Sequence, residues 1–476
     1  MKPLHIFNTL SRTVEEFSPA KAPMVTFYSC GPTVYAEQHL GNLRAYIFVD
    51  TLRRVLAYNG YDVRHVMNIT DVGHMTSDED AGEDKIEKTA RHEGRSPLEI
   101  ADEYLALFES DCLLLNIEPP IVQCRATEHI PEMIELIDKI IERGYGYVTP
   151  SGVYFDVEKW RGPSGMGRLS RQSLAEQHTA QRLEHSPDKH SPHDFALWVL
   201  NQPHHMMQWE SPWGRGYPGW HIECSAMSMK YLGATLDIHS GGLDHIAVHH
   251  ENEIAQSESA TGQPFVRYFV HNAFLVGMEG AKISKSAGRF PVLADLSNAG
   301  IKPLAFRMLC LGAKYRSELA FSLEAVRGAE RNLDYLYEFA SNLSEYALEA
   351  PADAEWVDEY KERFHLAINN DLNTAQALAV VNEMVAEAYR QNDKRIWRTL
   401  RRFDRVLGLG FESALEAARG QLPENIRMLS AAREQARAMK DFKRSDELRA
   451  ELEALGYAVK DSKGGITRIE RKRPAP

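Results

Sequence analysis

The stretch "MVTFYSCGPTVYAEQHLGNLRAYIFVDTLRRVLAYNGYDVRHVMNIT", residues 24–70, decides the fold class of this chain. Residues 24–29 alternate between apolar and polar side chains and are rich in β-branched and aromatic types, which indicates a strand. After a Gly-Pro break, residues 42–61 carry apolar side chains at helical spacing, with a helix ending at Asn59-Gly60. Residues 62–70 predict a second strand. A strand, a helix and another strand in this order predict the start of a parallel α/β sheet.

The sequence beyond this stretch changes character several times. Residues 76–145 are charged and helical in pattern, and residues 150–219 are rich in loop-forming Gly, Pro and Ser. Residues 268–278, "YFVHNAFLVGM", indicate another strand. After Leu319 the chain carries long amphipathic stretches, which predict a helical domain. From about residue 424 we expect two further helices and a small strand-rich end.

Composition narrows the class of protein. A chain of 476 residues should hold about two to four domains, and 43% hydrophobic with 26% charged residues is typical of a soluble globular protein. No apolar stretch approaches the roughly 18 residues of a membrane span, and the N-terminus lacks the apolar core of a secretory signal. The five cysteines are odd in number and scattered, which favours a reducing compartment, and we expect the cytoplasm.

The charge distribution leaves nucleic acid open as a partner. The net charge of −12 by itself argues against it, but local patches decide such binding. Residues 460–476 carry six basic and two acidic side chains, so this segment is either a basic contact surface or a solvated tail.

Two short stretches could bind phosphate. "HLGN", residues 39–42, lies between the first strand and its helix, where free backbone N–H groups attract anions. "KISKS", residues 282–286, lies among glycines and offers two lysines, a movable cationic clamp for a phosphoryl or adenylyl group. Taken alone, the first stretch is more often an ordinary helix start, and the second is more often a flexible, solvated basic loop.

A third stretch, "HHENE" at residues 249–253, could bind a metal. His249 and Glu253 are four residues apart and would share one face of a helix. Cys224 lies 25 residues before His249, and no local cysteine spacing indicates a zinc finger. Taken alone, such a cysteine is most often a small buried apolar residue, and a histidine pair before a helix is more often a capping or hydrogen-bonding pair.

The three stretches in this order resemble the class I aminoacyl-tRNA synthetases, with "HLGN" and "KISKS" in the places of the two class signatures. The details are similar to the cysteinyl-tRNA synthetase family, and the resemblance runs from about residue 4 to residue 470. The further segments that carry it are "CGPTVY" (30–35), "NITDVG" (68–73), "SPWGRGYPGWHIECSAM" (211–227), "DIHSGGLD" (237–244) and "HHENEIAQS" (249–257).

The resemblance implies one Zn²⁺ per chain, held by Cys30, Cys224, His249 and Glu253, with His239 beside these ligands. The metal would bind the thiolate of the substrate cysteine and would not activate water. Because a soft thiolate bonds zinc far better than a hydroxyl does, such a site would reject serine without an editing site.

The resemblance also implies contacts to the other substrates. The residues implied for adenylation are His39, Asn42, Lys282 and Lys285, and those for ATP itself are His39, Gly41, Asn42 and Lys285. Bound cysteine would be surrounded by Gly31, Thr70, Trp220 and Asp244, and the anticodon would be contacted by Phe442, Asp446 and Asp461. Among the departures from the family, Asn42 stands where the class signature has His, and Phe442 stands where the family has Trp. Phenylalanine keeps a stacking face but loses the indole N–H donor.

The implied activity is activation of L-cysteine by ATP with Mg²⁺, followed by transfer of the cysteinyl group to the 3′ end of tRNA(Cys). Two alternatives stay open: a ligase that joins cysteine to a small amine, similar to the mycothiol-pathway enzyme, and a catalytically silent paralogue that binds tRNA. Residues 415–476 look like an anticodon-binding end, which the first alternative would not need. We expect no membrane and no obligatory protein partner, and the resemblance implies a monomer.

The expected architecture is a class I Rossmann-like parallel-sheet core with an inserted connective domain, followed by a helical bundle and a small mixed C-terminal domain. The expected bounds are 1–120 for the first half of the catalytic core, 121–205 for the inserted connective region, 206–318 for the second half with the zinc ligands and the KISKS loop, 319–412 for a tRNA-binding helical bundle, and 413–476 for the anticodon-binding domain.

Overall fold

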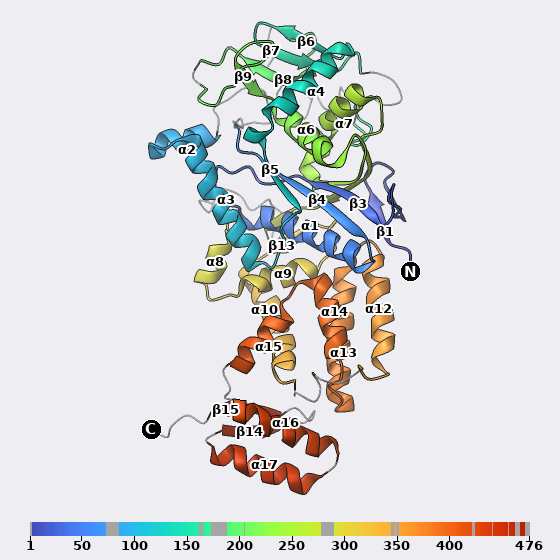
Figure 1. Cartoon of the computed structure of the whole chain (residues 1–476), viewed down its shortest axis with the longest axis vertical. Coiled ribbons are helices and arrows are strands. Elements are labelled where there is room, and N and C mark those ends of the chain that lie inside the picture. Colours follow the sequence, from blue (N-terminus) through green and yellow to red (C-terminus); the bar gives the residue numbers. More distant parts are fainter. Residues whose placement is uncertain are drawn as a thin grey trace. The chain divides into compact units, whose positions relative to one another are not determined.

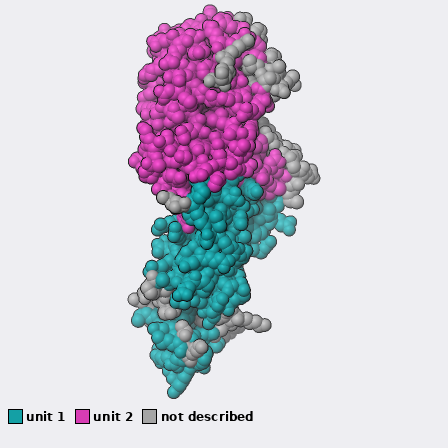
Figure 2. Space-filling view, turned by 90° about the vertical axis from the view of Figure 1, so that its right-hand side faces the viewer, with its two compact units in different colours: residues 1–4, 296–314, 321–476 teal, residues 5–295, 315–320 magenta. Residues whose placement is uncertain are grey.

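The chain forms two compact units (Figure 2). The sheet unit comprises residues 5–295 and 315–320, and the helical unit comprises residues 1–4, 296–314 and 321–476. The computed structural model describes residues 2–72, 85–160, 165–172, 188–203, 205–277, 290–343, 348, 352–420, 424–439, 441–455, 457–461 and 467–471.

The centre of the sheet unit is a five-stranded parallel sheet with the strand order β11-β10-β3-β4-β5. Figure 1 labels β3, β4 and β5 of this sheet. The strands are β3 (Met24–Ser29), β4 (Asp62–Ile69), β5 (Val122–Arg125), β10 (Leu236–Gly242) and β11 (Val266–Asn272). The strands expected at 24–29 and 62–70 are thus confirmed as β3 and β4. The segment expected as one strand at 268–278 forms two, β11 and β12 (Leu275–Gly277), because the chain turns at Ala273 and Phe274.

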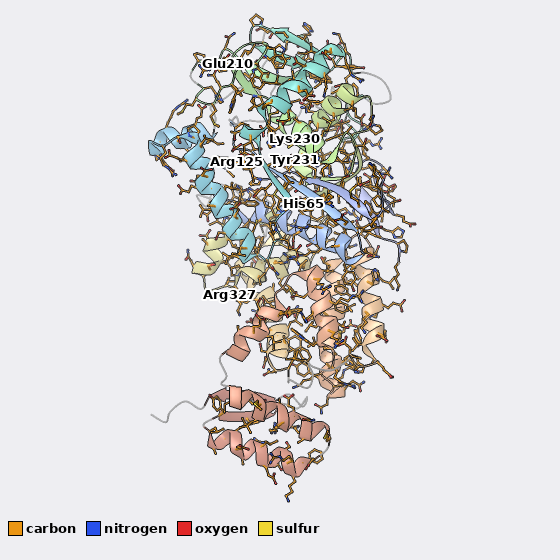
Figure 3. All side chains as sticks on the ribbon, viewed as in Figure 1. His65, Arg125, Glu210, Lys230, Tyr231 and Arg327 are labelled. Atoms are coloured by element: carbon orange, nitrogen blue, oxygen red, sulfur yellow. The ribbon has the colours of Figure 1, made fainter. Side chains whose placement is uncertain are left out.

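A buried polar contact joins the two central strands. Oγ of Ser29 on β3 lies 2.9 Å from Nε2 of His65 on β4, a residue marked in Figure 3. The ring of His65 also stacks on Phe27 with 4.6 Å between centroids. Burial lowers the pKa of His65 to about 3, so this imidazole is neutral at physiological pH.

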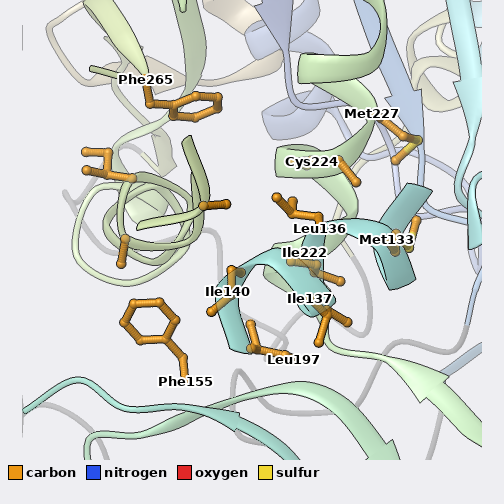
Figure 4. Close-up of a cluster of buried hydrophobic side chains, with 14 of the residues drawn as sticks. Met133, Leu136, Ile137, Ile140, Phe155, Leu197, Ile222, Cys224, Met227 and Phe265 are labelled. Atoms are coloured by element: carbon orange, nitrogen blue, oxygen red, sulfur yellow. The ribbon is translucent and has the colours of Figure 1, made fainter. Parts of the chain in front are cut away.

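Helices cover both faces of the parallel sheet (Figure 1). α1 (Leu40–Tyr58) connects β3 to β4 on one face and ends at Asn59, as its sequence predicts. α4 (Ile130–Glu142), α6 (Trp220–Leu232) and α7 (His249–Thr261) lie on the other face. Their inward side chains form a buried apolar cluster, which includes Met133, Ile137, Ile222 and Met227 (Figure 4).

The order of the strands creates a crevice. From β3 the chain moves outward to β4 and β5, and it returns to pair β10 with the opposite edge of β3. Loops that leave two neighbouring strands toward opposite faces of a sheet open a binding site at their carboxyl ends. The segments after β3 and β10 are therefore placed to bind a ligand.

An antiparallel sheet with the order β6-β7-β8-β9 is inserted between β5 and β10. Its strands are β6 (Gly146–Thr149), β7 (Gly152–Phe155), β8 (Phe195–Leu200) and β9 (Gly216–Pro218). The loop-rich interpretation of residues 150–219 was therefore incomplete. β8 is buried at every position, so its sequence "FALWVL" lacks the alternation that marks a half-exposed strand.

The sheet unit contains several further, mostly short elements. They are β1 (His5–Asn8), β2 (Thr13–Glu16), α2 (Lys85–Glu93), α3 (Pro97–Leu114), the 3₁₀ turns Ala126–Glu128 and Leu243–His245, β13 (Leu319–Phe321), which pairs with β12, and α8 (Leu293–Asn298), which ends in the helical unit.

The helical unit confirms the change of character after Leu319. Its helices are α9 (Pro303–Leu311), α10 (Leu323–Ser341), α12 (Val357–Asn369), α13 (Thr374–Gln391), α14 (Trp397–Leu407), α15 (Phe411–Gly420), α16 (Glu424–Ala438) and α17 (Phe442–Ala454), followed by the antiparallel pair β14 (Tyr457–Asp461) and β15 (Thr467–Arg471). None of the helices in the described part of the chain is long and apolar enough to cross a membrane. The five-part division by residue bounds stays a prediction.

Candidate active site and metal centre

A cavity of about 480 Å³ opens at the carboxyl ends of β3, β10 and β11. Its wall consists of the turn between β3 and α1, the first turns of α1, and the segments that follow β10 and β11. Enclosed spaces of this size are typical of small-molecule sites. The wall includes the sequence-predicted residues Cys30, Gly31, His39, Gly41, Asn42 and Asp244.

The "HLGN" stretch forms the start of α1. Nδ1 of His39 accepts a hydrogen bond of 3.2 Å from the backbone N–H of Asn42, so His39 is the N-cap of the helix. A Cβ atom on Gly41 would lie 3.0 Å from the His39 ring, which explains the small residue. Burial lowers the pKa of His39, so its ring is neutral, with the proton on Nε2 because Nδ1 accepts. The cavity thus meets a helix N-terminus, which favours phosphate.

The four residues predicted as metal ligands meet in one place, which we call the metal cluster. Cys30 follows β3, Cys224 lies on α6, and His249 and Glu253 lie one turn apart on α7. One ligand atom from each of the four lies within 4.8 Å of the others. Cys30 is half-buried and the other three are buried. Cys224 is also part of the apolar cluster in Figure 4, which fixes the helix that carries it.

The charges in the metal cluster suit a cation. Burial alone would raise the pKa of Glu253, but His239 and His249 lower it to about 2. A hydrogen bond from Cys224 lowers the pKa of the Cys30 thiol well below its ordinary value, although burial opposes this shift. The same hydrogen bond and burial raise the pKa of Cys224. Burial alone would lower the pKa of His249, but Glu253 and Cys30 raise it to about 10, so a histidine proton balances the negative charge of the cluster where a metal ion could do so instead.

The donor set fits zinc. Two sulfur atoms, an imidazole nitrogen and a carboxylate oxygen are ligand types that zinc accepts. Oε1 of Glu253 is buried without an aligned hydrogen bond from the described residues, although Nε2 of His249 lies 2.9 Å away. This oxygen keeps a lone pair that a cation could use.

A second combination, Cys30, His239, His250 and Glu253, also meets the distance requirement for a metal. Nε2 of His239, however, already lies in a hydrogen bond of 2.8 Å with Oε2 of Glu253. Nε2 of His249 also lies close to this carboxylate, 2.9 Å from Oε1, so the contact with Glu253 does not separate the two combinations. The combination that includes Cys224 and His249 offers two sulfur ligands, which suits a zinc ion that binds thiolates, and it leaves His239 as a neighbour that orients Glu253.

A chain of hydrogen bonds, which we call the histidine chain, supports Cys30 from behind. Nε2 of His250 lies 3.4 Å from Sγ of Cys30, and Nδ1 of His250 lies 2.8 Å from Nε2 of His271. Nδ1 of His271 lies 2.8 Å from Oγ1 of Thr9. Sequence reasoning missed His271 and Thr9, since neither lies in a recognisable motif. The double histidine of "HHENE" was the available signal for His250.

Gly31 and Thr70, predicted to surround bound cysteine, are joined through Asn68. The backbone N–H of Gly31 donates to Oδ1 of Asn68 at 2.8 Å, and Nδ2 of Asn68 donates to Oγ1 of Thr70 at 3.1 Å. Oγ1 of Thr70 in turn donates to Oε2 of Glu223 at 3.0 Å. Because its proton goes to Glu223, the Thr70 hydroxyl is left with a lone pair for a ligand. Asn68 and Glu223 were missed, although both lie inside the "NITDVG" and "HIEC" segments.

Trp220 lies beside the metal cluster, and Asp244 lies in the wall of the cavity. The Trp220 ring, at the start of α6, lies 4.4 Å from the His249 ring between centroids. Asp244 lines the cavity, and its side chain is 60% exposed. An indole face and a carboxylate both attract an ammonium group.

Five other predicted residues belong to the helical unit or lie outside the described residues. Lys282 and Lys285 lie outside the described residues. Phe442 and Asp446 are on α17 of the helical unit, where the Phe442 ring is 64% exposed, and Asp461 ends β14. Asp441 caps α17 by accepting the backbone N–H of Arg444 at 3.0 Å, so Phe442 occupies the first position of that helix.

Three family models match this chain. Residues 16–331 match the model described as "tRNA synthetases class I (C) catalytic domain". Residues 363–412 match the DALR domain, and residues 419–467 match the "Cysteinyl-tRNA ligase anticodon binding domain". The catalytic model alone covers most of the chain.

Curated relatives match along almost the whole length. Cysteine–tRNA ligase 1 of Burkholderia lata is 45% identical over 470 residues, which cover 97% of this chain and 96% of that protein. Cysteine–tRNA ligase of Treponema denticola is 42% identical and covers 98% of this chain and 99% of that protein. Among solved structures, a methionyl-tRNA synthetase of Mycobacterium tuberculosis in complex with methionyl-adenylate superimposes with a TM-score of 0.57 at 16% identity, over 95% of this chain and 98% of that one. That similarity shows the class I fold.

Proposed function

Because this chain belongs to the cysteine–tRNA ligase family of class I synthetases, we propose that it selects its amino acid with a zinc ion held by the metal cluster. The observation that carries the proposal is the meeting of Cys30, Cys224, His249 and Glu253, whose ligand atoms lie within 4.8 Å of one another. When bound there, zinc would supply a soft Lewis acid for the thiolate of substrate cysteine. The cluster borders the cavity through Cys30, so a side chain bound in the cavity can reach it.

The residues around the cluster are suited to hold the amino acid. Trp220 and Asp244 would attract the ammonium group, and Thr70 offers it a hydroxyl lone pair. Gly31 lets the turn that carries Cys30 approach the backbone of Asn68 closely, because a Cβ atom there would lie 1.6 Å from the Asn68 carbonyl oxygen. This arrangement directs the carboxylate toward the α1 end of the cavity, where we place the nucleotide.

ATP, with Mg²⁺, would bind with its phosphates at the N-terminus of α1. Nε2–H of His39 and the amide of Asn42 are donors to phosphate oxygens, and Lys282 and Lys285 would add positive charge as the transition state forms. The carboxylate of cysteine attacks the α-phosphorus, and pyrophosphate leaves. Because no protein nucleophile is needed, positioning and charge stabilisation carry this step.

The cysteinyl group would then pass to the terminal adenosine of tRNA(Cys). The helical unit would hold the tRNA, with Phe442, Asp446 and Asp461 near the anticodon. The exposed face of Phe442 supports this role, since an aromatic ring can stack on a base. We place the reaction in the cytoplasm, where the five free cysteines stay reduced.

The test is transfer of labelled cysteine to total tRNA, with serine as a competitor and a zinc-stripped control. We expect charging with cysteine alone, lost when zinc is removed and restored when zinc is added. Charging with serine would overturn the selection by zinc. Cysteine-dependent ATP–pyrophosphate exchange without any charging of tRNA would move the acceptor to a small amine.

Two further measurements test the assigned roles. Lys285→Ala should slow adenylation by well over tenfold, and a rate within a few-fold of the original would show that the role of Lys285 is wrong. Hydrolysis of Ser-tRNA(Cys) by the purified protein above background would contradict the expectation that the zinc site makes editing unnecessary.

A further inference from the structure

Gln38 is a buried amide directly before the "HLGN" stretch, and it connects the turn after β3 to Asn42. Its side chain is 5% exposed. Nε2 lies 3.3 Å from the carbonyl oxygen of Thr33 and 3.3 Å from that of Ala36. Oε1 accepts a hydrogen bond of 2.8 Å from Nδ2 of Asn42. Gln38 and Asn42 both line the cavity.

These contacts fix which end of each amide faces which neighbour. A backbone carbonyl can only accept, so the NH₂ group of Gln38 must face Thr33 and Ala36. Oε1 of Gln38 then faces Asn42, and only the NH₂ group of Asn42 can donate to it. Reversing both amides would remove the two bonds to the carbonyls and bring three oxygen atoms together.

The orientation of Asn42 decides what the cavity offers to a ligand. One hydrogen of its NH₂ group goes to Gln38, and the second has no acceptor among the described residues. Phosphate oxygens only accept hydrogen bonds, so a ligand phosphate needs a donor here. A reversed Asn42 would present Oδ1 instead, and two oxygen atoms would then repel each other.

We propose that Gln38 is a positioning residue for the nucleotide, which it serves by holding Asn42 as a hydrogen-bond donor to phosphate. The inference rests on the proposed function, because it takes the phosphates of ATP to lie at the start of α1. It also explains how Asn42 can replace the histidine of the class signature: an amide can face either way, and Gln38 determines the direction.

The experiment is a double-mutant cycle in cysteine-dependent ATP–pyrophosphate exchange with the full-length, zinc-loaded protein. Gln38→Met, which keeps size but removes both polar groups, should raise the KM for ATP and lower kcat/KM about tenfold. The KM for cysteine should not change. In the Asn42→Ala background the same substitution should change kcat/KM less than about twofold, because Gln38 acts through Asn42.

A second readout separates positioning from a general structural role. Adenosine, which has no phosphates, is used as a competitive inhibitor of the original protein and of Gln38→Met. The substitution should leave the inhibition constant of adenosine unchanged while it weakens the binding of ATP. If Gln38→Met does not fold, Gln38→Leu serves instead, because its apolar side chain also cannot accept a hydrogen bond from Asn42 and adds no charge near the phosphates.

Equal weakening of ATP binding and adenosine binding by Gln38→Met would overturn the inference. So would additive effects of Gln38→Met and Asn42→Ala on kcat/KM, or an unchanged KM for ATP. If the original protein shows no cysteine-dependent ATP–pyrophosphate exchange under the same conditions, the proposed function is overturned instead. The two failures are therefore distinguishable.

Discussion

Nε2 of His249 lies 2.9 Å from Oε1 of Glu253, and both side chains are buried on one face of α7. The two residues are four positions apart, so the helix itself sets their separation. Cys30 and Cys224 come from other elements, and the fold brings them to this pair. In the metal cluster, one helix thus sets the spacing of His249 and Glu253, and the tertiary fold adds Cys30 and Cys224 to this pair.

Glu253→Gln should remove zinc from the protein. Glutamine has the same shape but lacks the negative charge, and it leaves three strong ligands. We expect zinc affinity to fall more than about 100-fold, beyond the range of an outer-shell change. The measurement is metal content after dialysis against a graded chelator series. Glu258→Gln on the same helix is the matched control, since Glu258 pairs with Arg168. Full zinc retention by Glu253→Gln would contradict the assigned ligand set.

The histidine chain should contribute to zinc affinity from a distance. His271→Leu would leave Nδ1 of His250 without its partner, and Cys30 would lose its support, so we expect about tenfold weaker zinc binding. Thr9→Val should have a smaller effect in the same direction, and Thr9→Ser should have none because it keeps the hydroxyl. Competition with a fluorescent zinc chelator measures all three. Equal behaviour of the valine and serine variants would show that the hydroxyl is irrelevant.

Gly31→Ala should abolish activity through backbone displacement. A Cβ atom at Gly31 would lie 1.6 Å from the carbonyl oxygen of Asn68, so the turn that carries Cys30 must move. A shift of about 1 Å at a reacting group can cost about 100-fold in rate, and we expect at least this loss of kcat/KM in pyrophosphate exchange.

Gly328→Ala is the matched glycine variant. Gly328 lies within α10, and a Cβ atom there would meet only Nη2 of Arg331, at 3.6 Å. Alanine should therefore stabilise the helix by about 0.5–1 kcal/mol and leave activity unchanged. If Gly31→Ala were equally active, the close approach at Asn68 would have no functional role.

Asp111→Asn should stabilise the protein at neutral pH and not at pH 4. Burial, with a contribution from Glu37, raises the pKa of Asp111 from 3.8 to about 6. The ionised carboxylate of Asp111 therefore destabilises the folded state, and this destabilisation grows as the pH rises from 3.8 to about 6. The full shift corresponds to about 3 kcal/mol, and partial contact with solvent reduces the expected gain to about 1–2 kcal/mol.

Denaturant titration of Asp111→Asn and the original chain at pH 4 and pH 7.5 checks this prediction. The difference in unfolding free energy should appear only at the higher pH. A gain of the same size at both pH values would assign the effect to packing and not to charge.

The sequence predicted β3, α1 and β4 with little error, because each has a clear period and a clear break. It did not predict the four strands β6–β9. Three of them are only three or four residues long, and β8 is buried on both faces and so carries no alternation of apolar and polar residues. The helix that holds His249 and Glu253 could be derived from spacing. The cysteines could not be joined to it by spacing, since three elements separated along the chain must first pack together. For Thr9, His271 and Gln38 the sequence offered no signal, because their partners are set by tertiary contacts.

The order of the strands has a consequence for synthesis on the ribosome. β3 pairs with β10, so one edge of β3 stays open until residue 242 has left the ribosomal exit tunnel. Cys30 meets its partners on α6 and α7, so the metal cluster cannot form until residue 253 has left it. Until then the nascent chain carries one open edge of β3 and an uncoordinated Cys30 thiol. More than half of the polypeptide must therefore emerge before β3 and Cys30 have all their partners. During this interval a neighbouring chain can pair with the open edge of β3, and an oxidant can reach the Cys30 thiol.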